Sequence, residues 1–137
     1  MTIAYKESIR NDRLTLVSTA VDAGASAGKI KMYDGTRPAT GAVITTQTLL
    51  ATPIFNDPAF DVAASGSMAA DVDPIIEDTS AVAVGTLSWF RVTDSNDNFV
   101  FDGDIGLAGS DLNVNTLTTS VGVKVEITSL VLTAGNA

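Results

Sequence analysis

Residues 86–106 read Thr-Leu-Ser-Trp-Phe-Arg-Val-Thr-Asp-Ser-Asn-Asp-Asn-Phe-Val-Phe-Asp-Gly-Asp-Ile-Gly, and this stretch decides the fold class. It contains the only Trp and three of the five Phe of the chain. Two runs rich in aromatic and β-branched residues flank the polar segment Asp94–Asn98, a pattern typical of a β-hairpin with a short loop. Aromatic side chains that face one another across two strands stabilise such a pair. The sequence therefore predicts a central hairpin in an all-β domain.

The composition limits the classes of function. The chain has 137 residues, which lets one domain bury about two thirds of its unfolded surface. It has no Cys and no His, which excludes disulfides, thiolate metal sites and the commonest general base. Residues 1–7 have no apolar core of signal-peptide length, and no apolar run is long enough to span a membrane. We expect a soluble protein made in the cytoplasm.

Charge is distributed unevenly along the chain. Residues 1–37 hold six basic and four acidic residues, whereas residues 38–137 hold two basic and twelve acidic residues. This acidic body makes nucleic acid and anionic membranes unfavourable partners. Only 18% of the residues are charged and 45% are hydrophobic, so the surface is poor in long solvated side chains. Such a surface suits a subunit that is partly covered by its neighbours, although a surface of Thr, Ser, Ala and Asn is also soluble alone.

Residues 5–23 are the one segment with a helical pattern. At 100° per residue, a stripe of apolar side chains runs along one face and polar side chains occupy the opposite face. The stripe consists of Ile9, Leu16 and Ala20, with Leu14, Val17 and Val21 beside it. Gly24 follows at a position suited to ending a helix. The sequence thus predicts an N-terminal arm and helix, residues 1–24, followed by a β domain, residues 25–137.

Three basic residues, Lys6, Arg10 and Arg13, lie on the apolar side of this helix in its N-terminal half. In one interpretation this basic half projects beyond the domain and binds an acidic neighbour. In the other, the long side chains extend over the protein's own edge, or the helix begins only at an N-cap residue 11 or 12. Arg37 and Pro38, in a turn-rich loop after the first predicted strand, are the other candidates for a protein interface.

Short strands are predicted in the rest of the chain. Lys29–Tyr33 alternates, with Ile30 and Met32 on one face and the two lysines and the tyrosine on the other. Further strands are expected at residues 47–55, at 59–70 with a turn at 65–66, at 111–116 and at 121–133. A change of phase at Thr128-Ser129 predicts a β-bulge in the last strand. Many short strands with frequent turns predict an antiparallel β-sandwich of the jelly-roll or immunoglobulin-like kind, with one short N-terminal helix.

No set of residues carries recognisable reaction chemistry. Asp94, Asn96 and Asn98 place oxygens at positions 1, 3 and 5 of a calcium loop, but Phe99 stands where an EF-hand has Gly and Ile105 where it has Glu. A hairpin turn accounts for the same residues. No Ser has a His partner for nucleophilic catalysis, and no Gly-rich loop binds phosphate. We expect no enzyme, no cofactor and no metal site.

Four segments occur in a recognisable order. They are residues 8–14 (Ser-Ile-Arg-Asn-Asp-Arg-Leu), residues 28–38 (Gly-Lys-Ile-Lys-Met-Tyr-Asp-Gly-Thr-Arg-Pro), the hairpin of residues 89–103, and the valine- and leucine-rich ending of residues 127–137. In this order they resemble a group of small virion structural proteins from tailed bacteriophages. The resemblance implies a β-sandwich subunit present in several copies on the virion, with no catalytic residues.

The function expected from this resemblance is that of a capsid decoration (cement) protein. Such a protein forms a homo-oligomer, here expected to be a trimer, and binds the major capsid protein or other virion proteins across the seams between capsid subunits. Its location is the virion, after assembly in the host cytoplasm. A neck, collar or tail-associated subunit is the alternative within this class. A carbohydrate- or receptor-binding β-sandwich, with its site in loops 34–40 and 94–98, is the alternative from another class.

Overall fold

The central hairpin is formed by β6 (Trp89–Thr93) and β7 (Phe99–Gly106), which pair antiparallel in the computed structural model, where residues 3–135 are described. All five residues of β6 are buried: Phe90 and Val92 belong to the core, whereas on the other face the Tyr33 ring stacks on Trp89 and Arg91 is held by the carbonyl oxygen of Ala42. The polar segment Asp94–Asn98 connects the two strands. The predicted hairpin is confirmed.

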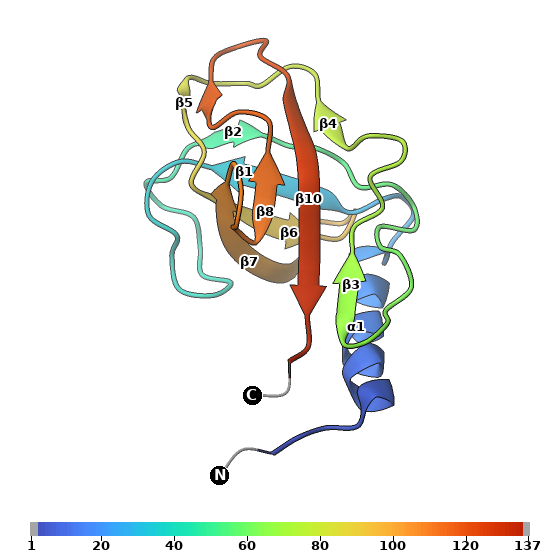
Figure 1. Cartoon of the computed structure of the whole chain (residues 1–137). Helices are drawn as coiled ribbons and strands as arrows, with labels where there is room; N and C mark the ends of the chain where they lie inside the picture. Colours follow the sequence, from blue (N-terminus) through green and yellow to red (C-terminus); the bar gives the residue numbers. More distant parts are fainter. Residues whose placement is uncertain (1–2, 136–137) are drawn as a thin grey trace.

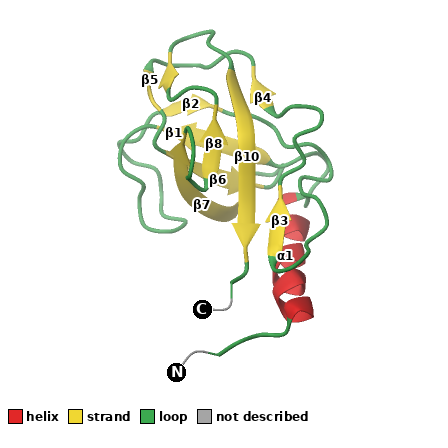
Figure 2. Ribbon diagram, viewed as in Figure 1, coloured by secondary structure: helices red, strands yellow, loops and turns green. Residues whose placement is uncertain are grey.

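Eight strands form one mixed sheet in the order β2-β1-β6-β7-β8-β10-β3, with β4 paired to β10 (Figures 1 and 2). The other strands of this sheet are β1 (Lys29–Tyr33), β2 (Leu49–Ala51), β3 (Ser67–Ala69), β4 (Glu77–Asp78), β8 (Leu112–Val114) and β10 (Val125–Thr133). A separate two-stranded sheet consists of β5 (Gly85–Thr86) and β9 (Thr118–Thr119). The sheet is not closed into a barrel.

One pair breaks the antiparallel pattern that the sequence predicted. β7 and β8 are parallel, with Ile105 opposite Leu112 and Gly106 opposite Asn113. A parallel pair usually needs a long crossover. Here the short loop of residues 107–111 suffices because the two strands pair over only two residues each. The prediction of a purely antiparallel sheet is therefore wrong at this pair.

The sheet folds over a single hydrophobic core. Figure 1 shows β8 and β10 running across the front of β1, β6 and β7, with β3 beside the lower end of β10 and in front of α1 (Glu7–Val21). Fully buried side chains from both groups of strands meet between them, among them Ile30, Met32, Phe90, Leu112, Ile127 and Leu130. Burial of each such side chain contributes about 1.5–3 kcal/mol, which makes this core the main source of the fold's stability.

Helix α1 (Glu7–Val21) packs beside β3 (Figure 1). It begins earlier than residue 11 or 12, so the shorter helix considered from the sequence is wrong, and it is slightly shorter than the predicted span of residues 5–23. Leu14 and Val21 are its buried residues, whereas the predicted apolar stripe of Ile9, Leu16 and Ala20 lies in solvent. The helix packs on the β domain through the face whose residues form hydrogen bonds with that domain. This face is not the most apolar face of the helix.

Several finer expectations are met. β1 has the predicted bounds, with Ile30 and Met32 fully buried, although Tyr33 is buried as well because its ring stacks on Trp89 at 4.6 Å between centroids. The predicted bulge appears as a register shift between Ile127 and Ser129 in β10. Other strands are shorter than expected. In particular, β10 begins at residue 125, because residues 121–124 form a turn and a connecting segment.

Candidate protein-interaction surfaces

Arg10 joins the N-terminal half of α1 to the β domain. Its Nε donates to the carbonyl oxygen of Ala134 at 2.6 Å, and its Nη2 donates to the carbonyl oxygen of Ser65 at 3.4 Å. On the next helical position, Asn11 Oδ1 accepts a hydrogen bond from Gly66 N at 2.8 Å. Gly66 has φ +72°, and a side chain there would collide with the Arg10 guanidinium. This is the contact expected if Arg10 extends over the protein's own edge, and its interface role stays a prediction.

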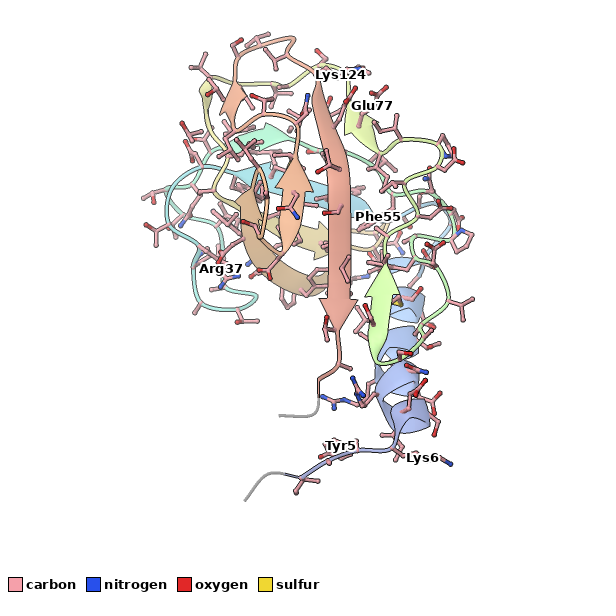
Figure 3. The ribbon with its side chains drawn as sticks, in the orientation of Figure 1. Tyr5, Lys6, Arg37, Phe55, Glu77 and Lys124 are labelled. Carbon is pink, nitrogen blue, oxygen red and sulfur yellow. The ribbon has the colours of Figure 1, made fainter. Side chains whose placement is uncertain are left out.

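Lys6 and Arg13 lie at the exposed side of the same helix end. Figure 3 places Tyr5 and Lys6 at the N-terminal end of α1, away from the sheet. The Arg13 guanidinium lies over the Tyr5 ring, 5.4 Å from its centroid. Both basic side chains are therefore positioned where a neighbouring acidic surface could reach them. Their role in an interface stays a prediction.

The outward face of α1 is apolar. Ile9 is 46% exposed and Leu16 is 71% exposed, and Ala20 continues the same stripe. Within residues 3–135 the stripe is left largely uncovered, with Leu16 mostly in solvent and Ile9 half-exposed. A surface helix normally turns such a stripe toward the core of its own domain. Here α1 turns a second apolar face outward, which is a feature of helices that bind a partner.

The loop that contains Arg37 and Pro38 lies on another side of the molecule. Figure 3 shows Arg37 far from Lys6, so the structure does not bring the predicted interface residues together into one surface. Arg37 Nη1 lies 3.5 Å from Asp104 Oδ1, an exposed ion pair of the kind that contributes about 0–1 kcal/mol. Pro38 is half-buried. This loop is a second, separate candidate surface.

A buried ion pair beneath this loop was missed by the sequence reasoning. Arg91 donates from Nε and Nη2 to the two carboxylate oxygens of Asp102, at 2.8 and 2.9 Å. Its Nη1 donates to the carbonyl oxygen of Ala42 at 2.8 Å, and Asp102 also accepts from Gly41 N at 3.1 Å. The hydrogen bonds that Arg91 donates to Asp102 raise the pKa of Arg91 above its ordinary value. The pair therefore fixes the 41–42 segment of the loop onto the hairpin.

The hairpin loop is a turn stabilised by its own side chains. Asp94 Oδ1 accepts hydrogen bonds from the backbone N–H groups of Asn96 and Asn98, and its Oδ2 accepts one from the Asn98 side chain. The interpretation of residues 94–98 as a turn is confirmed. Residues 3–135 contain no group of three or more acidic side chains arranged to hold a metal ion.

Asp97, at the tip of the turn, pairs with two lysines of β1. Its Oδ1 lies 3.0 Å from Lys29 Nζ and 2.8 Å from Lys31 Nζ. Hydrogen bonds from Lys31 and then Lys29 hold the pKa of Asp97 below its ordinary value. Two basic residues of the N-terminal third therefore share one carboxylate partner within the chain, which leaves Lys6 and Arg13 as the basic side chains most open to a partner.

Comparison with known proteins gives no relative. No family model matches the chain, and neither a curated protein nor a solved structure matches it. Within residues 3–135, no helix has the length and apolar character needed to cross a membrane.

Proposed function

We propose that this chain is a virion structural protein, a capsid decoration protein of a tailed bacteriophage that forms a homo-oligomer and joins neighbouring capsid subunits. The observation that carries the proposal is the outward apolar stripe of α1, with Ile9 and Leu16 in solvent. Burying a large aliphatic side chain contributes about 1.5–3 kcal/mol, so a partner that covers the stripe gains binding free energy. The proposal that the particle is a phage virion is based on the resemblance of the sequence to virion structural proteins of tailed bacteriophages.

A second apolar surface supports this proposal. Val82, Val84 and Val121 are all exposed, and their segments are joined by hydrogen bonds between Ala81 and the 122–123 turn. In Figure 1 these segments lie at the end of the molecule near β5, opposite the N-terminal end of α1. A subunit with apolar surfaces at two ends is suited to contacts with more than one neighbour, as a protein that bridges capsid subunits requires.

The finer fold assignment belongs to the same proposal. We assign the folded-over sheet to the β-sandwich architecture, with β1, β6 and β7 in one layer and β8, β10 and β3 in the other. Its support is the single core that side chains of both groups fill. The parallel pair of β7 and β8 then marks the corner where the chain passes from one layer to the other.

The test uses the purified full-length chain. We expect light scattering after size-exclusion chromatography to give a homo-oligomer, and sedimentation with capsids that lack the protein to recover it on the particles. Electron microscopy of these particles should show many copies over the capsid faces. Density confined to the neck or tail would assign the chain to that part of the virion instead. A monomer that does not bind capsids overturns the proposal.

A further inference from the structure

The sheet contains a gap between β7 and β10. The strand between them, β8, has only three residues, and it pairs with β7 at Ile105 and Gly106 alone. Its pairing with β10 ends at Leu130. Residues 99–104 of β7 and residues 131–133 of β10 therefore continue past the start of β8. Within residues 3–135, no strand lies between these two stretches. Each of them has one edge toward the gap that no strand of the described residues pairs, and on the β7 edge Asp104 N donates to Asp111 Oδ2 at 3.0 Å.

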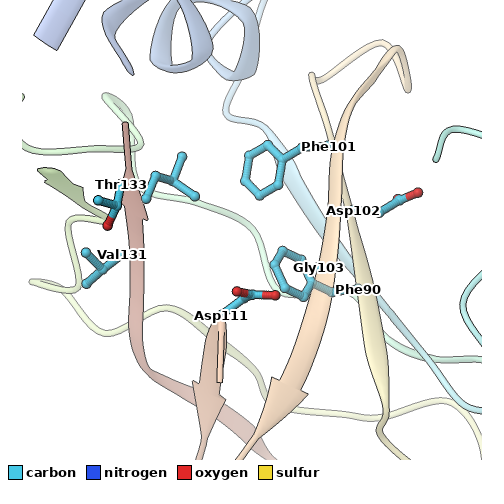
Figure 4. A pocket seen from close by; sticks show the side chains of 8 residues that line it. Phe90, Phe101, Asp102, Gly103, Asp111, Val131 and Thr133 are labelled. Atoms are coloured by element: carbon cyan, nitrogen blue, oxygen red, sulfur yellow. The ribbon is translucent and has the colours of Figure 1, made fainter. Parts of the chain in front are cut away.

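A cavity of about 330 Å³ occupies this gap. Its lining comes from β7, β10, the core strand β6 and the residue before β8, as Figure 4 shows. The rings of Phe90 and Phe101 lie between the two strand edges, and Asp111 closes the end next to β8 (Figure 4). Phe101 and Leu132 are only partly buried although both pack against the core. The gap is thus a slot between two strand edges, lined by aromatic and aliphatic side chains together with polar groups, and we call it the β7–β10 slot.

An extended peptide is the ligand that such a slot fits. Open strand edges present N–H and C=O groups at the spacing of a neighbouring strand, and alternate side chains of an added strand point to the same face. Addition of a strand to a sheet edge is a common mode of peptide recognition, in which the backbone provides affinity and the pockets provide specificity. Leu132 and Phe101 lie where the inward side chains of an added strand would be buried.

The chain itself carries a segment with these properties. Residues 3–6, Ile-Ala-Tyr-Lys, lie outside helix and strand and precede α1. Ile3 is 70% exposed and Tyr5 is 44% exposed, and as alternate residues they share one face of an extended strand. The segment carries one charge, the positive charge of Lys6, whereas Asp111, which lines the slot, carries a negative charge.

The arm of a second copy is the occupant that this arrangement favours. In Figure 1 the N-terminal arm lies beyond the end of β10, apart from β7. We propose that residues 3–6 of one copy enter the β7–β10 slot of another copy as an added strand, with Ile3 and Tyr5 turned toward Phe101 and Leu132. Each copy then offers one arm and one slot, so the contact gives a reciprocal pair, a ring where the rotation between copies closes, or a filament where it does not. This inference rests on the proposed self-association and identifies the contact that produces it.

Disulfide formation between two differently tagged chains tests the arrangement, because the natural chain has no cysteine. One chain carries Ile3→Cys, and the other carries Thr133→Cys at an exposed position that lines the slot. After mixing and mild oxidation, we expect a linked pair that contains both tags. The matched control replaces Thr133→Cys by Thr40→Cys, an exposed position in the 34–48 loop. Equal linkage in the control overturns the inference.

A chain that carries both Ile3→Cys and Thr133→Cys identifies the source of the arm. At low concentration, a linkage within one chain shows that the slot takes its own arm, and this overturns the second-copy assignment.

A proline in the arm tests the strand pairing itself. Ala4→Pro removes a backbone N–H and disfavours pairing, while it leaves every helix and strand of residues 3–135 unchanged. We expect at least a tenfold rise in the dissociation constant of the oligomer, with an unchanged melting temperature of the dilute monomer. Ala4→Ser is the matched control and should associate like the natural chain. If the natural chain forms oligomers and Ala4→Pro associates equally well, the slot is not the contact, although self-association stands. If the natural chain is monomeric, both proposals fail.

Discussion

The guanidinium of Arg91 and the carboxylate of Asp102 face each other across the central hairpin and form two hydrogen bonds of 2.8 and 2.9 Å. The two side chains are almost entirely buried. The guanidinium also lies 5.5 Å from the centroid of the Trp89 ring and 5.1 Å from that of Phe99. A two-pronged pair of this kind is directional as well as strong, so it holds the register of the hairpin and the position of the loop above it.

Removal of one partner leaves the other charge buried without compensation. Asp102→Ala should therefore lower the free energy of unfolding by about 3 kcal/mol, measured by urea denaturation at pH 7. Asp104→Ala is the matched control, because its carboxylate is exposed and its pairing with Arg37 contributes about 1 kcal/mol or less. Equal losses in the two variants would show that the Arg91–Asp102 pair is not the anchor of the loop.

The same pair shows why part of the molecule could not be predicted from the sequence. If the strands of the hairpin were paired regularly from Thr93 opposite Phe99, Arg91 would face Phe101. A register shift between Val92 and Thr93 moves the pairing by one residue and brings Asp102 opposite Arg91. Opposite charges on the two strands were visible in the sequence, but the bulge that makes them meet was not.

Helix α1, in contrast, shows which features of the fold a local sequence pattern does predict. Its existence and approximate bounds follow from the 3.6-residue period, which is a local property of the sequence. The period shows a stripe of Ile9, Leu16 and Ala20, but it does not show which face packs on the sheet. That choice depends on the hydrogen bond that Arg10 donates and the one that Asn11 accepts, both with residues more than fifty positions away, which no local pattern encodes. The strand Lys29–Tyr33 and the bulge in β10 were predictable because alternation is also local.

The ion pairs of Asp97 predict a pH dependence of stability. Because Lys31 and Lys29 lower the pKa of Asp97 in the folded state, the folded chain holds its charged form more strongly than the unfolded chain does. The resulting stabilisation is present in full above the unfolded pKa of about 3.9, and it is lost as the pH falls through the lower folded pKa. Asp97→Asn should thus have a lower melting temperature than the natural chain at pH 7, and the difference should shrink toward pH 2.

The matched control for this pH experiment is Asp61→Asn. Asp61 is exposed, and no ion pair involves its side chain within residues 3–135. Its melting temperature should follow that of the natural chain at every pH. A constant difference for Asp97→Asn between pH 7 and pH 2 would contradict the assignment to these two lysines.

Arg10 and Arg13 should differ in their contribution to stability. Arg10→Met removes the hydrogen bonds to the carbonyl oxygens of Ala134 and Ser65, and we expect a loss of about 1.5–3 kcal/mol in the free energy of unfolding. Arg13→Met removes only the exposed contact with the Tyr5 ring, which contributes about 0.5–1 kcal/mol. Urea denaturation of the two variants measures the difference. Association experiments on the basic helix end should therefore use Lys6→Glu and Arg13→Glu, since an effect of Arg10→Glu would combine folding with binding.

Leu16 provides the most direct test of the outward face of α1. Its side chain is 71% exposed, so Leu16→Glu should change the free energy of unfolding of the isolated chain by about 0.5 kcal/mol or less. If a partner covers the stripe, the same substitution places a charge in an apolar interface and should abolish capsid binding or self-association, measured by capsid sedimentation and light scattering. Ser8→Glu is the matched control, because residue 8 is exposed and lies about 80° away around the helix axis. Unchanged association of Leu16→Glu in both assays would remove the observation on which the proposed function rests, whereas its loss with Ser8→Glu unaffected would locate the interface on this stripe.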